Sequence, residues 1–330
     1  MATTKQTVTL GKALNMGLRK AMEDDDKVVI LGEDIGKLGG VFRITDGLQK
    51  DFGEHRVLDT PLAESGIVGT AVGLALRGYR PVCEIQFDGF VFPAFDQIIS
   101  QVAKVTYRSQ GVWSMPVVIR IPYGGGIGAV EHHAESPESF FCHIAGLRVV
   151  ACANPQDAYD MIRDAIACQD PVIFLEPKRR YWEKGTVDPN AGGDRLSSFS
   201  TVLRRGGSQA TLVGYGATMP VVLAAADAAA AEGRSLEVFD LRTLSPLDLD
   251  PVVESVRRTG HCVVVSEAPR EASLASDVAA RITEEAFYSL AAPVLRVTGF
   301  DTPYPPSKLE EEYLPDLDKV LAAVDRTLAY

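Results

Sequence analysis

Short runs of apolar and β-branched residues alternate along the chain with longer segments in which apolar residues recur at helical spacing. In the first half, the runs at 28–31, 57–58, 82–87, 116–121, 147–151 and 172–175 predict strands. The segments near 64–77, 93–109 and 155–168 predict helices between them. Nearly continuous apolar strands separated by helices are typical of a parallel sheet that is covered on both faces. The first half is therefore predicted to be an α/β domain.

This pattern stops between Glu183 and Ser200, where the sequence EKGTVDPNAGGDRLSSFS is rich in Gly, Asp, Ser and Pro. Such a composition is typical of a linker. We therefore divide the chain into a domain at 1–185, a linker at 186–200 and a second domain at 201–330. The pattern restarts in the second domain with strands predicted at 210–214, 236–240, 262–266 and 294–297, and helices at 219–232, 248–258 and 273–288. These elements predict a second, smaller α/β domain.

Composition narrows the function classes. The chain has 330 residues, of which 46% are hydrophobic and 23% charged, an ordinary balance for a globular protein. The net charge of -11 argues against nucleic acid and anionic membranes as partners. The sequence has neither an apolar run of about 18 residues nor an N-terminal secretory pattern. The five cysteines are widely spaced, so we expect reduced thiols and a cytoplasmic protein.

One carboxylate stands out in the segment DTPLAESGIVGTAVGLALRG, residues 59–78. Glu64 is the only ionisable residue from Thr60 to Leu76. Thr60 followed by Pro61 predicts a helix N-cap with proline in the first turn, and Glu64 comes one residue too late for a capping box. The carboxylate either supports the helix dipole, worth about 0.3–1 kcal/mol, or it is a functional group at the mouth of a buried helix. The residues alone leave both interpretations open.

A second candidate is the segment GGGIGAVEHHAESPESFFCH, residues 124–143. A glycine-rich loop there carries His132 and His133 among several glutamates. Metal binding, acid–base or substrate-positioning chemistry, and a plain surface loop are all compatible with this composition. An acid–base or positioning histidine is favoured, because α/β folds place ligands at the carboxyl ends of their strands.

Two segments resemble nucleotide-binding motifs, but their surroundings in the sequence do not match. Gly124, Gly126 and Ala129 fit the spacing of a dinucleotide loop, but EHHAESPES follows where a helix should begin. GEDIGK, at 32–37, is one residue too short for a phosphate-binding loop. The chain also lacks the GDG segment and paired asparagines with which thiamine enzymes hold diphosphate and magnesium. A hydrolase is a poor fit, because no GxSxG elbow occurs.

Several motifs together resemble a known family. They occur in the order DTPLAESGIVG, CEIQFDGFVFPAFDQI, HHAESPESFF, FLEPKRRYW, DLRTLSPLD, SEAP and GFDTPYP. From about residue 7 to 325, the chain resembles the beta subunit of the thiamine diphosphate-dependent, decarboxylating component of 2-oxo acid dehydrogenases. HHAESPESFF and EPKRRYW are more similar to the branched-chain enzyme, 3-methyl-2-oxobutanoate dehydrogenase, than to the pyruvate enzyme.

The resemblance implies a fold and a set of partners. The fold would be a pyrimidine-binding α/β domain followed by a transketolase-like C-terminal α/β domain. The chain would form an α2β2 heterotetramer in which the alpha subunit holds the diphosphate and magnesium, which explains the missing GDG segment. Together they would decarboxylate a 2-oxo acid and acylate the lipoyl group of a dihydrolipoyl acyltransferase.

The resemblance also assigns residues. Glu64 falls at the position of the glutamate that activates the cofactor through its aminopyrimidine ring. His133 falls on a histidine near the thiazolium ring, with His132 as its neighbour. Leu62, Gln86 and Phe90 fall on the lining of the pyrimidine pocket, where a tyrosine is expected in place of Phe90.

A structural potassium ion is implied as well. Its ligands would come from Met115, Val117, Val118, Ala165, Cys168 and Asp170. Cys168 departs from the usual aspartate, and a thiol is a poor ligand for a hard cation.

Two alternatives stay open at this point. The first is a pyruvate or acetoin dehydrogenase beta subunit with the same architecture. The second is a non-catalytic α/β scaffold or binding protein, which would not purify with a chain that carries the GDG segment.

Overall fold

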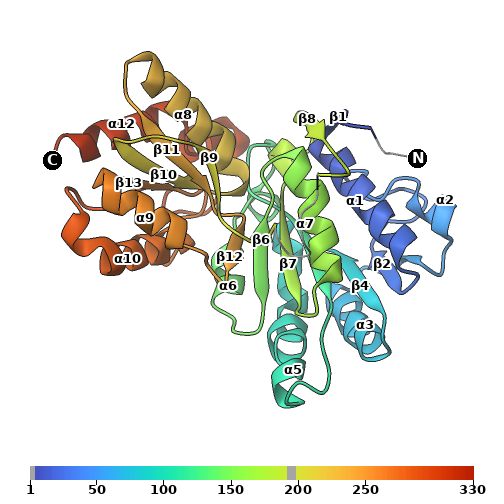
Figure 1. Cartoon of the computed structure of the whole chain (residues 1–330). Coiled ribbons are helices and arrows are strands. Elements are labelled where there is room, and N and C mark those ends of the chain that lie inside the picture. The colour runs from blue at the N-terminus through green and yellow to red at the C-terminus, as the bar shows by residue number, and fades with distance from the viewer. Residues whose placement is uncertain (1–3, 192–197) are drawn as a thin grey trace.

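The computed structural model describes residues 4–191 and 198–330, and Figure 1 shows two lobes joined along the middle of the molecule. The strands up to Val187 are β1 (Gln6–Thr9), β2 (Val28–Gly32), β3 (Val57–Asp59), β4 (Arg80–Glu84), β5 (Val118–Tyr123), β6 (Arg148–Ala151), β7 (Val172–Pro177) and β8 (Lys184–Val187). The later strands are β9 (Val202–Arg205), β10 (Ala210–Gly214), β11 (Leu236–Asp240), β12 (Thr243–Ser245), β13 (Cys262–Val265) and β14 (Leu295–Val297).

The α-helices are α1 (Leu10–Asp24), α2 (Leu48–Phe52), α3 (Glu64–Leu76), α4 (Phe95–Gln97), α5 (Val105–Arg108), α6 (Glu138–Cys142), α7 (Pro155–Ala167), α8 (Met219–Ala231), α9 (Asp250–Thr259), α10 (Leu274–Ala286), α11 (Glu310–Tyr313) and α12 (Leu317–Leu328). Short 3-10 turns are η1 (Asp88–Ala94), η3 (Glu131–His133), η4 (Lys178–Arg180), η5 (Gly216–Thr218), η6 (Phe287–Ser289) and η7 (Ser307–Leu309), and η2 (Ile98–Val102) is a π turn.

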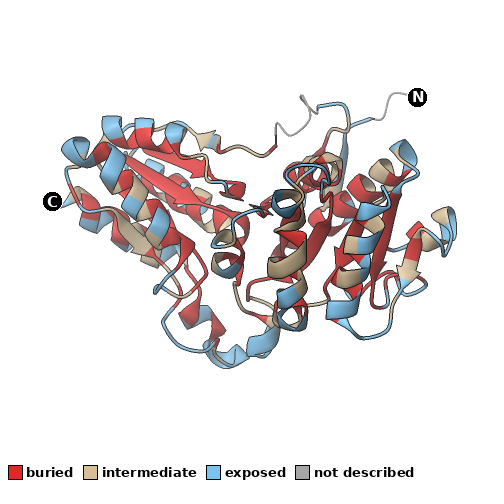
Figure 2. Ribbon diagram, turned by 90° about the horizontal axis from the view of Figure 1, so that it is seen from below, coloured by how far each residue is buried: buried red, intermediate tan, exposed pale blue. Residues whose placement is uncertain are grey.

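The larger sheet has the strand order β12-β6-β7-β5-β4-β2-β3, and β2 to β7 run parallel within it. Alternate residues of each strand enter opposite cores, so Val82 packs with α1 and α7 while Cys83 packs with α3. Figure 2 shows the buried strands between helices whose outer faces are exposed. The predicted parallel sheet covered on both faces is confirmed.

The smaller sheet has the order β14-β13-β10-β11-β9, in which only β9 pairs antiparallel. It forms the second predicted α/β unit, with α8 and α12 packed on one face. The two units are joined at one edge of the larger sheet. There β12, which follows β11 of the second unit in the chain, pairs antiparallel with β6 of the first unit. Sequence periodicity cannot reveal that β12 joins the larger sheet, since this strand is only three residues long.

The predicted linker differs in part from the structure. β8, at its start, pairs antiparallel with β1, and Val187 is buried, so the chain leaves the first unit as a strand. Residues 192–197 of the predicted linker lie outside the described residues. The exact domain limits therefore stay a prediction.

The helix predicted near 93–109 is present as several short helical elements and not as one regular α-helix. Residues 88–108 form η1, α4, η2 and α5 in succession. Pro93 lies inside η1 and has no N–H to donate, and η2 is a π turn. The apolar spacing that suggested one helix is produced by several short turns that face the same core.

Candidate active site

The carboxyl ends of neighbouring parallel strands bring the candidate residues together. β3, β2, β4, β5 and β7 are consecutive or near neighbours in the larger sheet. Glu64 follows β3, Gln86 and Phe90 follow β4, and His133 lies on the loop after β5. In open α/β sheets this edge is the usual place for ligands.

Glu64 is the first residue of α3, with Ala63 as its N-cap. The prediction that Thr60 caps the helix is therefore wrong. The Thr60 amide instead donates to the Gly32 carbonyl at 3.0 Å, which extends the pairing of β3 with β2, and its hydroxyl has no partner among the residues that the structure describes. Glu64 is only 8% exposed, and no described residue donates a hydrogen bond to its carboxylate. It lies at the positive end of the helix dipole.

Glu33, directly after β2, is a second buried carboxylate beside Glu64. Burial raises the pKa of Glu33, and the nearby charges of Glu64 and Asp34 raise it further. Its Oε1 atom is buried and has no hydrogen-bond partner in the described part of the chain. Glu33 was not among the residues predicted from the sequence, although its place directly after an apolar strand was a usable signal. Two neighbouring carboxyls without donors fit a ligand ring that supplies hydrogen-bond donors or a shared proton.

The three residues expected to line the pyrimidine pocket differ in their exposure and in their contacts. Leu62 is 81% exposed, which is unusual for a leucine beside a buried helix. The Gln86 amide lies 3.4 Å from the Asp34 carboxylate. The Phe90 ring is partly buried and packs edge-on to Phe87.

His133 is held by aromatic contacts. Its ring centroid lies 4.0 Å from that of Phe87 and 5.1 Å from that of Phe90. Its Nδ1 atom is buried and has no hydrogen-bond partner among residues 4–191 and 198–330. Burial, followed by the neighbouring His132, lowers the pKa of His133, which favours a neutral ring that can accept a proton. His132 is half exposed, lies 3.5 Å from the Glu131 carboxylate and packs its ring against that of His133, with 4.3 Å between the centroids.

A buried ion pair supports the His133 loop. Asp88 and Lys178 are both almost fully buried, and their carboxylate and ammonium groups are in contact. The second Asp88 oxygen accepts a hydrogen bond from the Glu135 amide at 2.8 Å. The pair thus links the ends of β4 and β7 to the loop that carries His133. Both residues lie in motifs noted in the sequence, but only the fold shows that residues 90 positions apart form a pair.

A second buried charge cluster lies below this edge. The Arg120 guanidinium binds Glu176 through Nε at 2.7 Å and Nη2 at 3.0 Å, and Glu84 through Nη1 at 2.5 Å. Tyr181 donates to Glu176 at 2.6 Å. Each residue comes from a different strand or turn, so the cluster ties β4, β5 and β7 together at the floor of the site.

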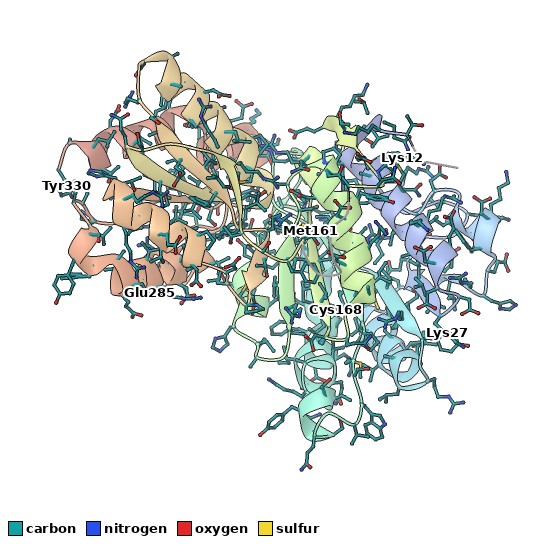
Figure 3. All side chains as sticks on the ribbon, viewed as in Figure 1. Lys12, Lys27, Met161, Cys168, Glu285 and Tyr330 are labelled. Atoms are coloured by element: carbon teal, nitrogen blue, oxygen red, sulfur yellow. The ribbon has the colours of Figure 1, made fainter. Side chains whose placement is uncertain are left out.

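The residues expected to bind potassium lie away from this edge, between the start of β5 and the end of α7. The carbonyls of Met115, Val117 and Ala165 accept hydrogen bonds from the amides of Val117, Val172 and Cys168. Cys168, labelled in Figure 3 just after α7, accepts at its carbonyl from the Arg80 guanidinium at 3.1 Å.

The remaining expected potassium ligands are also engaged. Asp170 pairs with Arg148 at 2.9 Å, and Val118 lies in β5, between β4 and β7. Because Arg80 already places a positive charge at the Cys168 carbonyl, these residues do not fit a potassium ion as they are arranged. Potassium stays a prediction that this arrangement does not favour.

Two further observations concern metals and membranes. Among residues 4–191 and 198–330, no three His, Cys, Asp or Glu side chains gather closely enough to hold a metal ion. None of the helices in this part of the chain is long and apolar enough to cross a membrane.

Comparison with known proteins places this geometry in a class. The transketolase pyrimidine-binding domain matches residues 6–183, and the transketolase C-terminal domain matches residues 200–320. A solved structure described as a split gene transketolase, inactive beta4 tetramer, covers 98% of both chains with a TM-score of 0.81 and 23% identity, and so shares the fold. The fold is thus that of the thiamine diphosphate-dependent transketolase class.

Relatives define the family within this class. The chain is 61% identical to the pyruvate dehydrogenase E1 component subunit beta of Leifsonia xyli subsp. xyli, covering 98% of this chain and 96% of that protein. It is 52% identical to the 3-methyl-2-oxobutanoate dehydrogenase subunit beta of Mycobacterium tuberculosis, covering 98% and 92%. The 2-oxoisovalerate dehydrogenase subunit beta of Pseudomonas aeruginosa is 42% identical, covering 99% and 97%. The chain belongs to the E1 beta subunits of the 2-oxo acid dehydrogenases.

Proposed function

We propose that this beta subunit joins an alpha subunit in an α2β2 heterotetramer that oxidatively decarboxylates branched-chain 2-oxo acids. The acyl group would pass to the lipoyl group of a dihydrolipoyl acyltransferase. The observation that carries the proposal is Glu64, a buried residue whose carboxylate accepts no hydrogen bond from the described residues, beside Glu33 at the sheet edge that also presents His133. The alpha subunit would supply the diphosphate and magnesium site, for which this chain has no motif.

The unpartnered polar atoms fit the aminopyrimidine end of thiamine diphosphate. When bound, the cofactor supplies the nucleophilic carbon and the electron sink for loss of carbon dioxide. Glu64 would hold a proton at a ring nitrogen, because burial at a helix start gives it a fixed position and no competing donor. Leu62 and Phe90 would pack against the ring, and the Gln86 amide would face its polar edge.

His133 would handle protons near the reacting carbon or orient the lipoyl group. We expect His133→Ala to reduce turnover about a hundredfold with the lipoyl acceptor and much less with an artificial electron acceptor. Because the pKa of His133 is lowered, the acceptor reaction should stay active as the pH falls to 6.5 and decline only below it. Steady-state rates of the assembled enzyme with both acceptors, from pH 5 to 8, check this.

His55, an exposed histidine before β3, supplies the control, since His55→Ala should change neither rate by more than about twofold. Equal losses with the two acceptors in His133→Ala would move the role of His133 to decarboxylation itself.

Sequence motifs and relatives both bear on the substrate. The motifs HHAESPESFF and EPKRRYW and the relative from M. tuberculosis support branched-chain substrates, while the L. xyli relative supports pyruvate. Co-expression with candidate alpha subunits, followed by competition between 3-methyl-2-oxobutanoate and pyruvate, decides between them. We expect kcat/KM for the branched substrate to exceed that for pyruvate by about tenfold or more, since a few buried methyl groups provide 1–3 kcal/mol. Turnover of pyruvate alone would contradict the branched-chain assignment.

A further inference from the structure

The glycine-rich loop after β5 is bound by carboxylates from the second half of the chain. Glu310, the first residue of α11, accepts hydrogen bonds from the Gly126 amide at 2.7 Å and the Gly128 amide at 2.9 Å. Glu267, which follows β13, accepts one from the Gly125 amide. These three glycine amides are therefore satisfied inside the protein and are not free to bind a phosphate.

The contact requires glycine. A Cβ atom on Gly125 would lie 1.7 Å from the Tyr304 hydroxyl oxygen, and Gly126 has φ of +84°. The Tyr304 hydroxyl donates to Glu310 Oε1 at 2.7 Å and also accepts from the Gly126 amide at 3.2 Å. Glu310 is only 8% exposed, so these hydrogen bonds to a charged acceptor are shielded from water.

The far end of the same loop is fixed as well. The Gly124 amide donates to the Glu135 carbonyl at 2.8 Å, which closes the loop at its base. The Glu135 amide binds Asp88, whose neighbour Phe87 packs against the His133 ring. His133 lies between the glycines bound by Glu310 and Glu267 and the residue Glu135, which it precedes by two positions. Release of the glycines would therefore free the backbone that sets the position of the histidine.

We propose that Glu310, aided by Glu267, is a positioning residue for His133. The second α/β unit thereby orders a catalytic loop of the first unit through Glu310, which lies 184 positions from Gly126 along the chain. The inference rests on the proposed function, in which His133 acts beside the cofactor. Glycine has the largest backbone entropy of any residue, so three consecutive glycines hold one conformation only while such anchors persist.

The test uses the assembled enzyme with Glu310→Ala, Glu310→Gln and the control Glu311→Ala, which changes an exposed glutamate of the same helix. We expect Glu310→Ala to speed hydrogen exchange of the 124–135 amides by about tenfold or more, because the two hydrogen bonds from loop amides to the carboxylate are lost together with that from Tyr304. Glu310→Gln keeps one acceptor oxygen and should give a smaller increase. Glu311→Ala should leave exchange unchanged.

The ratio of turnover with the lipoyl acceptor to turnover with an artificial acceptor gives a second readout. A purely structural role of Glu310 would leave this ratio unchanged. Glu310→Ala should lower lipoyl-dependent turnover more than turnover with an artificial acceptor, as His133→Ala does. Combined with His133→Ala it should cause no further loss, because both changes remove the same positioned group. If Glu310→Ala fails to fold, Tyr304→Phe keeps the ring and removes one hydroxyl bond to Glu310 and one from Gly126.

The two proposals fail in different ways. Exchange and acceptor preference that match wild type in Glu310→Ala would overturn the positioning role while leaving the proposed function intact. Fully additive losses in the double variant would also overturn it. Wild-type enzyme without 2-oxo acid turnover would contradict the proposed function, and the exchange measurement would still decide whether Glu310 orders the loop.

Discussion

Glu64→Gln should lower 2-oxo acid turnover of the assembled enzyme by about a thousandfold, within the range for removing an acid–base group. The carboxamide keeps the shape of the side chain but cannot take up a proton or carry the charge. Because Glu64 is buried at the start of α3 and accepts no hydrogen bond from a described residue, its carboxylate would be available to the cofactor, and a carboxamide in the same place would not carry the charge. Stopped-flow or steady-state assays with saturating thiamine diphosphate measure the effect.

The loss of turnover in Glu64→Gln should come from the chemical step and not from impaired assembly or cofactor binding. Gel filtration with the alpha subunit and titration of thiamine diphosphate should give wild-type results for Glu64→Gln. Glu54→Gln, which changes an exposed glutamate, provides a control and should retain full turnover. A Glu64→Gln enzyme that works within a few fold of wild type would remove Glu64 from the proposed mechanism.

Arg120→Met should destabilise the chain by about 3–5 kcal/mol, because it leaves two buried carboxylates without their counter-ion. Glu84 and Glu176 are 5% and 0% exposed, so water cannot take the place of the guanidinium. Burial already raises the pKa of Glu84 while Arg120 opposes that shift. For a chain of this size, the expected drop in Tm is about 10 °C by circular dichroism.

Two variants test the cause. Arg148→Met breaks the partly exposed pair with Asp170 and should cost no more than about 1 kcal/mol. Adding Glu84→Gln and Glu176→Gln to Arg120→Met should recover part of the lost stability, because no unpaired charge then remains in the cluster. An Arg120→Met protein as stable as Arg148→Met would mean that the buried charges are relieved in another way.

Local sequence patterns predicted the elements better than their limits. The apolar strands and most helices are confirmed, because burial on both faces of a parallel sheet leaves a continuous apolar run. The N-cap of α3 is Ala63 and not the predicted Thr60, because the hydrogen bond of Thr60 to Gly32 extends the strand pairing before the helix starts. Residues 88–108 broke into short turns around Pro93, which apolar spacing alone does not reveal.

The candidate site divides in a similar way. Glu64 and His133 attract attention in the sequence, because each is an ionisable residue in an unusual context. Their neighbours Glu33, Asp88 and Lys178 do not, since each looks like an ordinary charged residue until the strand order is known.

The sequence by itself determined the alternation of strands and helices, the two α/β units and the family, because these depend on local periodicity and on residue order. Only the tertiary structure decided which charged groups meet. Glu310 reaches Gly126, Lys178 reaches Asp88, and Arg120 lies between two glutamates of neighbouring strands. Such contacts depend on how the strands are ordered and how the two units pack, and hydrogen bonds of a few ångströms carry no signature in residues that lie tens of positions apart.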